Sequence, residues 1–159
     1  MKIRNANESD LGKIQNLLRA SDLPVGDVST TLIEGFLVAE DASGTVVGSG
    51  GLEQIGSSVL LRSLALTPEW RGTGVARKLV ELLENNALSL GQQEVWLLTT
   101  TAERFFERAG YEWVSRNDVP GDVRLCRQFA ALCPSTAMCM RKRLSKKNSS
   151  AAIERPESN

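Results

Sequence analysis

Residues 61–87 read LRSLALTPEWRGTGVARKLVELLENNA and hold the features that decide the fold. Apolar residues alternate up to Pro68, which ends a strand over 59–67 because proline cannot donate to a sheet ladder. A glycine-rich turn follows at 71–74, and an amphipathic helix then runs to Gly91, a residue suited to closing a helix. The apolar face of that helix carries Val75, Leu79, Leu82, Leu83 and Leu90.

The turn, Arg71-Gly72-Thr73-Gly74, is suited to binding phosphate groups. Gly72 and Gly74 remove side chains where a ligand would approach the backbone. The first N–H groups of the helix have no partner within it and lie at its positive dipole end, which favours a pyrophosphate. The spacing matches neither GxxxxGK(S/T) nor GxGxxG, so the turn by itself also fits a connection that binds no ligand.

The remaining elements alternate between strands and helices over the length of one domain. Expected strands are 1–5, 36–40, 45–54, 94–99, 111–115 and 134–144. Expected helices begin after Asn7 or Ser9, at residue 102, and near residue 118 with an end at 132. Hairpin strands followed by a strand–helix–strand unit predict a mixed α/β sheet. We expect one domain over 1–144 and a disordered polar tail over 145–159.

Composition excludes several kinds of chemistry. The chain has 159 residues and no histidine, which rules out Ser-His-Asp triads, Cys-His dyads and histidine-ligated zinc or iron, and we expect no metal. Nineteen basic and nineteen acidic residues cancel, which argues against a nucleic-acid partner. No apolar run suits a signal segment or a membrane span, and the three cysteines lack CxxC spacing, so we expect a cytoplasmic protein.

Two motifs, in order, resemble those of the GNAT N-acetyltransferases. The family pattern (R/Q)-x-x-G-x-(G/A) is matched by Arg71, Gly74 and Ala76, after a strand in which Leu64, Leu66 and Pro68 match hydrophobic-x-hydrophobic-x-Pro. Downstream, TTTAERFFERAGY resembles the second motif, a helix that ends in a glycine–aromatic pair. The resemblance covers about 1–144 and implies an α/β (α+β) GNAT fold. That fold is a mixed, mostly antiparallel sheet of six to seven strands, flanked by helices, with splayed central strands.

The resemblance also implies acetyl-CoA as co-substrate and assigns residues to it. On the family template, the Leu64 N–H would polarise the acetyl carbonyl and the Leu66 backbone would hold the pantetheine arm. The backbone of 71–76 would hold the pyrophosphate, with added charge from Arg71 and Arg77. The expected cofactor contacts are Leu64, Ala65, Leu66, Arg71, Gly72, Thr73, Gly74, Val75, Ala76, Arg77, Thr99 and Phe106.

Phe106 departs from the family pattern. Many members place a tyrosine there to protonate the departing thiolate, and phenylalanine has no proton to give. Tyr111 stands in the glycine–aromatic pair, where we expect it to pack. The absence of histidine also removes the most familiar base, which leaves a carboxylate acting through water or an amine that arrives neutral.

Glu53 and Arg62 are expected on the substrate side. They are charged residues in apolar strands joined by a short turn, and a loop of two or four residues places both on one face of the hairpin. Glu53 would act as base or bind an ammonium, Arg62 would clamp a carboxylate or oxyacid, and Thr100 would add a substrate contact. A cross-strand surface salt bridge with no catalytic role explains the same pair equally well.

Three longer stretches resemble one branch of this family, the arsenic-resistance-associated (ArsN-type) proteins: LLRSLALTPEWRGTG, WLLTTTAERFFERAGY and FAALCPSTAMCMRKRL. The branch implies acetylation of a small amine, such as an amino-acid-like arsenical or phosphinic analogue, by direct transfer in a ternary complex. Acetylation of a protein or peptide amine is an alternative, and a catalytically silent acyl-CoA-binding sensor is another. Homodimers are common in the family, which makes a homodimer a further expectation.

Overall fold

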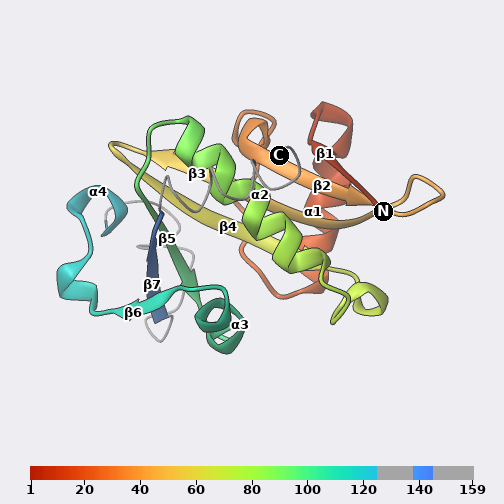
Figure 1. The fold of residues 1–159 in the computed structure, drawn as a ribbon. Coiled ribbons are helices and arrows are strands. Elements are labelled where there is room, and N and C mark those ends of the chain that lie inside the picture. The colour runs from red at the N-terminus through yellow and green to blue at the C-terminus, as the bar shows by residue number, and fades with distance from the viewer. Residues whose placement is uncertain (125–137, 145–159) are drawn as a thin grey trace, which may run out of the picture.

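The computed structural model describes residues 1–124 and 138–144, which form one sheet with helices on both faces (Figure 1). Its strand order is β1-β2-β3-β4-β5-β7-β6. The strands are β1 (Lys2–Asn5), β2 (Phe36–Glu40), β3 (Val46–Ile55), β4 (Ser58–Leu66), β5 (Glu94–Thr99), β6 (Glu112–Val114) and β7 (Met138–Arg143). The helices are α1 (Leu11–Ala20), α2 (Val75–Ser89), α3 (Glu103–Arg108) and α4 (Gly121–Arg124), with 3-10 turns at Glu8–Asp10, Leu32–Gly35, Pro68–Trp70 and Arg116–Asp118.

The sheet is antiparallel except at its centre, where β4 and β5 run parallel. These two strands share a single registered pair, Leu60 with Trp96, and then diverge (Figure 1). A ladder needs its strands about 4.8 Å apart, so the loss of register beyond Leu60 opens the sheet along the rest of β4. The expected fold, with six to seven mostly antiparallel strands and a splayed centre, is confirmed.

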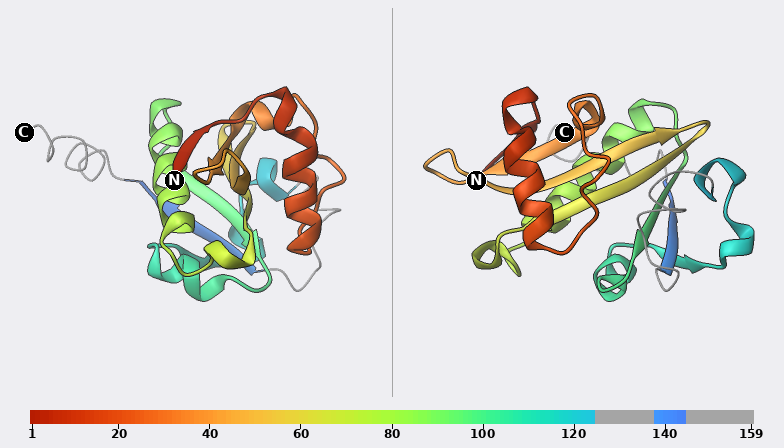
Figure 2. Two further views of the ribbon diagram at one scale, coloured as in Figure 1. Left: turned by 90° about the vertical axis from the view of Figure 1, so that its right-hand side faces the viewer. Right: turned by 180° about the vertical axis from the view of Figure 1, so that it is seen from behind.

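Helices α1 and α2 cover opposite faces of the sheet (Figure 2). Successive strand residues point to opposite faces, so neighbours in β2 belong to different cores. Phe36 packs with Ile14 and Leu18 of α1, whereas Leu37 packs with Leu79 of α2. The helical spacing of apolar residues in both helices thus matches the two faces that the sheet offers.

Glycines in β3 allow its neighbours to pack closely. A Cβ at Gly51 would lie 2.1 Å from the Phe36 ring, and a Cβ at Gly48 would lie 2.5 Å from a methyl carbon of Leu66. At either position a Cβ would force the neighbouring side chain to move: the buried Phe36 ring at Gly51 and the Leu66 side chain at Gly48. The glycines that weaken β3 in the sequence therefore make room for the residues on either side.

Helix α2 ends earlier than the sequence indicates. Leu90, expected on its buried face, follows the last helical residue, Ser89, and is 54% exposed. Val80 and Ala87 take buried positions instead. Gly91 adopts a φ of +83° just beyond the helix, as expected of a closing glycine.

The C-terminal predictions are tested only in part. Of the helix expected over 118–132, the structure describes α4, and of the strand expected over 134–144 it describes β7. Residues 125–137 and 145–159 lie outside the described residues. The polar tail over 145–159 and the domain boundary at 144 stay predictions.

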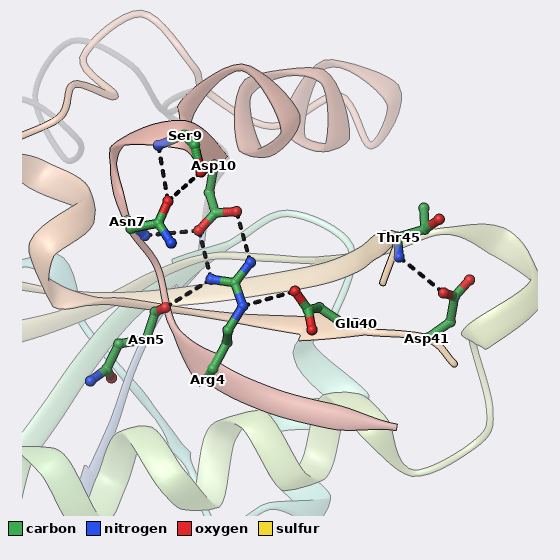
Figure 3. A network of polar contacts seen from close by, with 8 residues as sticks. All are labelled: Arg4, Asn5, Asn7, Ser9, Asp10, Glu40, Asp41 and Thr45. Carbon is green, nitrogen blue, oxygen red and sulfur yellow. Dashed lines mark hydrogen bonds and ion pairs between the residues drawn. The ribbon is translucent and has the colours of Figure 1, made fainter. Parts of the chain in front are cut away.

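Arg4 of β1 anchors the start of α1 (Figure 3). Its guanidinium donates to the two carboxylate oxygens of Asp10 at 2.8 and 3.0 Å, and its Nε donates to Glu40 Oε2 at 2.8 Å. Asp10 is fully buried and also accepts a hydrogen bond from the Asn7 N–H at 2.8 Å, as part of a capping box. The hydrogen bonds from Arg4 lower the pKa of the Asp10 carboxyl, although burial opposes them.

We expect Asp10→Asn to lower the free energy of unfolding at pH 7 by about 1–3 kcal/mol, because Arg4 loses a charged partner. The Asp10 pKa is lowered in the folded state, so its stabilisation is complete above the unfolded value of 3.8 and fades as the pH falls through the folded value. Urea unfolding at pH 7 and pH 3 should therefore show a difference between the two proteins that narrows in acid. A difference of equal size at both pH values would contradict this account.

Candidate active site

The opening between β4 and β5 leads into a cavity of about 900 Å³. Residues from four segments line it: the second half of β4 (61–66), the turn and start of α2 (71–77), the end of β5 with the start of α3 (97–106), and the loop after α1 (21–24). A concave site of this size holds a small ligand and buries much of its surface. The cavity therefore brings together both motif regions identified in the sequence.

The glycine-rich turn lines this cavity. Gly72 has a φ of +75°, and Gly74, which caps α2, has a φ of +92°; L-residues other than glycine rarely adopt these angles. No side chain caps the start of α2. Its first N–H groups are consequently available to a ligand, at the positive end of the helix dipole.

Of the other residues in and after this turn that are expected to bind the cofactor, three line the cavity and two do not. Arg71, Ala76 and Arg77 line the cavity. Thr73 and Val75, which were expected to contact the cofactor, do not line the cavity. The Thr73 hydroxyl donates to the Trp70 carbonyl oxygen, and the Val75 side chain is buried in the core.

β4 carries a bulge where it borders the cavity. The β3–β4 register shifts by one residue, so that Ser63 and Leu64 stand together opposite Gly50. Ser63 has a φ of +59°, which is rare for any residue but glycine. Within the described strands, Leu64 has no registered partner on β3, and the register with β5 ends at Leu60. Leu64 lines the cavity. Its backbone N–H and C=O lie where neither the β3–β4 ladder nor the β4–β5 ladder has a registered pair.

Phe106 supplies an apolar wall to the cavity. It lies edge-on to Phe105 and to Tyr111, with ring centroids 5.0 and 5.5 Å away. Tyr111 is buried behind it and donates its hydroxyl proton to Glu84 Oε2 at 2.9 Å. Burial, and then the charge of Glu84, raise the pKa of Tyr111 well above its usual value. Tyr111 packs, as expected, and holds its proton inside the core.

The remaining expected contacts also line the cavity: Ala65, Leu66, Thr99 and Thr100. Thr99 Oγ1 accepts a hydrogen bond from the Ala102 N–H at 2.9 Å, just before α3 begins at Glu103. The proton of this hydroxyl remains available for a second bond. Thr100 is exposed at the cavity edge.

Arg62 lies in the cavity wall with its side chain 1% exposed. It donates to the two oxygens of Asp27 at 2.6 and 2.7 Å, to Glu53 Oε1 at 2.8 Å, and from Nε to Ser63 Oγ at 3.2 Å. Burial lowers the pKa of Arg62, but the hydrogen bonds that it donates to Asp27 and Glu53 outweigh burial and raise the pKa overall. The guanidinium is therefore a permanent, buried charge.

The predicted pairing of Glu53 with Arg62 is confirmed, and its setting differs from both expectations. A two-residue turn at 56–57 puts the two side chains on one face of the hairpin. The pair is buried at Arg62, so it is no surface salt bridge, and Asp27 occupies the bidentate face of the guanidinium. Glu53 does not line the cavity and contacts it through Arg62.

The chain matches the acetyltransferase (GNAT) domain model over residues 33–113. It belongs to the GNAT acetyltransferases. It is 32% identical to an amino-acid acetyltransferase of Mycobacterium tuberculosis, in an alignment of 137 positions that covers 80% of this chain and 78% of that protein. It is 33% identical over 90 residues, 55% of its length, to an amino-acid acetyltransferase of Pseudomonas syringae pv. syringae, of which it spans only 21%.

Solved GNAT structures superpose on most of the chain. A Mycobacterium tuberculosis protein in complex with CoA is 26% identical, with a TM-score of 0.78 over 91% of this chain and 100% of that one. N-acetylglutamate synthase from Neisseria gonorrhoeae, complexed with coenzyme A and N-acetyl-glutamate, is 19% identical, with a TM-score of 0.79 over 91% of this chain and 35% of that one. This GNAT protein is accordingly an acyltransferase that uses acetyl-CoA.

The described residues contain neither a membrane-spanning helix nor a group of metal ligands. None of the helices in 1–124 and 138–144 is long and apolar enough to cross a bilayer. Over the same ranges, no three acidic or cysteine side chains gather into a group that would hold a metal ion.

The sequence patterns did not point to Asp27, Ser49 or Asp22, although these residues lie in or beside the site. Asp27 lies in an irregular loop 35 positions before Arg62, and no periodic pattern links the two residues. Ser49 is a fully buried hydroxyl that interrupts an apolar strand, which is a signal that the sequence does contain. Asp22 is the one carboxylate among the described lining residues, in a loop whose path the sequence does not fix.

We expect Asp27→Asn to destabilise this GNAT protein more than Glu53→Gln does. The Asp27 side chain is 7% exposed and holds two bonds to a buried guanidinium, and breaking such a pair costs about 3–5 kcal/mol. The Glu53 side chain is 24% exposed and holds one bond, so its loss costs about 1 kcal/mol. Urea unfolding at pH 7 measures both values.

Asp22→Asn is the matched control for that comparison. It removes a carboxylate from the same loop at an exposed residue with a φ of +57°, where asparagine is favoured, so it should leave stability unchanged or higher. Equal losses for Asp27→Asn and Glu53→Gln would show that the buried bidentate pair is not the stronger link.

Proposed function

We propose that this acetyltransferase moves the acetyl group of acetyl-CoA to the α-amine of an amino acid or a close analogue, by direct attack in a ternary complex. One observation carries the proposal: a single cavity joins the glycine-rich turn, Leu64 and Arg62. An amino-acid acceptor is supported by the Mycobacterium tuberculosis relative, which is named an amino-acid acetyltransferase and aligns over most of both chains.

In this proposal, one end of the cavity holds the pyrophosphate of acetyl-CoA. The free N–H groups at the start of α2 donate to the phosphate oxygens, and the helix dipole favours their charge. Arg71 and Arg77 line the same end and add charge-assisted hydrogen bonds. The pantetheine arm then follows the unpaired edge of β4 past Leu66, where β5 has already diverged.

The reacting carbonyl lies in the middle, where the Leu64 N–H donates to the thioester oxygen as negative charge develops on it. The amine nitrogen bonds to the carbonyl carbon, the C–S bond breaks, and the surplus amine proton passes to water. Phe106 has no proton to give, so the CoA thiolate takes its proton from water. An alkyl thiol has a pKa of about 8.5, which makes the thiolate an adequate leaving group near neutral pH.

The acceptor occupies the end near Arg62 and Asp22. Asp22 is the one carboxylate among the described lining residues, and its negative charge attracts an ammonium group. Bonds to described residues occupy four of the five N–H groups of Arg62, which leaves one Nη2 N–H for a substrate carboxylate. The bidentate clamp expected from the sequence would require Asp27 to move. A role for Glu53 as base stays a prediction.

The finer identity of the acceptor also belongs to this proposal. The relatives named above support an amino acid, and they give no support to an arsenical or phosphinic analogue. Those analogues, and a protein or peptide amine, are therefore competing acceptors to be tested beside amino acids. A silent acyl-CoA-binding sensor is not favoured, because the family and its named relatives are acetyltransferases.

The test is release of CoA thiol from acetyl-CoA in the presence of an amine panel. The panel holds the common amino acids, their arsenical and phosphinic analogues, polyamines and a lysine-containing peptide, with mass spectrometry of each product. We expect turnover with α-amino acids. Acetylation confined to the peptide, or to analogues alone, would overturn the amino-acid proposal, and no turnover with any amine would overturn acetylation of small amines.

We expect Gly74→Ala to raise the Kd for acetyl-CoA about tenfold or more, because its Cβ enters the space where the pyrophosphate approaches the turn. Gly91→Ala is the matched control at the other end of α2. Both glycines have positive φ, and a Cβ at either meets no protein atom within 4 Å. Each substitution should cost about 1–2 kcal/mol of stability.

Calorimetric titration with acetyl-CoA, together with thermal unfolding, separates binding from strain in these two variants. The two proteins should lose similar stability, and only Gly74→Ala should lose affinity. Equal affinities in the two variants would place the pyrophosphate elsewhere.

A further inference from the structure

We propose that Ser49 of β3 is a positioning residue for acetyl transfer, because its hydroxyl holds the β4 bulge that presents the Leu64 N–H to the thioester. Ser49 lies on the neighbouring strand and does not line the cavity. It therefore acts through the backbone of Ser63 and has no contact with substrate. This inference rests on the role proposed above for Leu64.

The contact that carries the inference is a hydrogen bond inside the sheet. Ser49 is 0% exposed, and its Oγ donates to the Ser63 carbonyl oxygen at 2.8 Å. Burying a hydroxyl without a hydrogen-bond partner destabilises the fold, and the Ser63 carbonyl oxygen is the partner that the Ser49 hydroxyl has. The same carbonyl belongs to the peptide unit that contains the Leu64 N–H, since a peptide plane joins one residue's carbonyl to the next residue's nitrogen.

Fixing this carbonyl fixes the direction of the Leu64 N–H. The peptide unit is planar and trans, so its C=O and N–H point in opposite directions. Ser49 draws the carbonyl toward β3, and the N–H of the same unit is thereby turned to the other side of β4, where β5 has diverged and the cavity opens. One bond from β3 thus sets the orientation that an oxyanion donor needs.

The bulge needs such a hold because its backbone is unfavourable. Ser63 has a φ of +59°, a conformation that strains a residue with a Cβ by about 1–3 kcal/mol. A second contact, from Arg62 Nε to Ser63 Oγ at 3.2 Å, secures the side chain of the same residue. Opposite the bulge stands Gly50, where a Cβ would lie 3.1 Å from Leu83 and 3.2 Å from Leu64.

Ser49→Ala removes the hydroxyl with almost no change of shape. We expect kcat to fall about tenfold to a hundredfold, less than the 10²–10³ lost when an oxyanion donor is deleted, because the donor is misaimed and still present. The KM for the amine and the Kd for CoA should stay within about twofold, since neither ligand depends on the carbonyl donor. Val47→Ala in the same strand is the control, because it loses core packing and lies outside the cavity lining.

Ser63→Gly provides a rescue that a merely structural role for Ser49 would not show. Glycine adopts a positive φ without the Cβ penalty, so the bulge persists without the Ser49 bond. In a double-mutant cycle, removal of the Ser49 hydroxyl should therefore reduce kcat at least fivefold less in the Ser63→Gly background than in the natural one. Equal losses in both backgrounds, or full kcat in Ser49→Ala, would overturn the inference.

An acceptor-free measurement separates this inference from the proposed function. The carbonyl stretch of bound 13C-acetyl-CoA reports polarisation by the Leu64 N–H, and it should be lower in the wild-type protein than in Ser49→Ala. If the wild-type stretch equals that of free acetyl-CoA, the role proposed for Leu64 fails. If the wild-type stretch is lowered and Ser49→Ala retains the same value, only the role of Ser49 fails.

Discussion

The structure depends on the break in backbone pairing between β4 and β5. A continuous ladder would satisfy the backbone of both strands and leave no room for a ligand, whereas here registered pairing ends after Leu60 and Trp96. The strands that diverge beyond this point frame the cavity, and the bulge at Ser63 lies in its wall. The catalytic role proposed for the Leu64 N–H needs no particular side chain, which suits a chain without histidine.

The segments on either side of the break between β4 and β5 are held in place by buried charged side chains. Arg62 ties the loop after α1 to β4 through Asp27, beside the bulge. On the other side, Glu84 of α2 accepts from Lys142 of β7 at 3.0 Å and from Tyr111 at 2.9 Å, which joins the helix to the far half of the sheet. The hydrogen bonds in these ion pairs depend on angle as well as distance, so they restrict how the joined segments lie relative to one another.

The sequence predicted the parts of the site that depend on local rules. Two glycines before an amphipathic helix indicated a phosphate-binding turn, and both have the positive φ that only glycine takes easily. The hairpin turn placed Glu53 and Arg62 on one face because strand side chains alternate. The prediction that Leu90 lies on the buried face of α2 was wrong, because the periodic pattern does not fix where the last turn of a helix ends. Asp27 was missed because contacts between a loop and a distant strand leave no periodic signal in the sequence.

By itself, the sequence determined the order of strands and helices, the glycine-rich turn and the absence of a histidine or tyrosine acid in the expected places. Only the tertiary structure decided that Asp27 accepts two hydrogen bonds from Arg62, that Glu53 accepts a third, and that Ser49 Oγ donates to the Ser63 carbonyl in the bulge. The physical reason is the distance along the chain between the residues that interact. Turns, caps and strand alternation act between neighbours in the chain, whereas the partners of a buried charge or hydroxyl depend on which distant segments the folded sheet brings within about 3 Å.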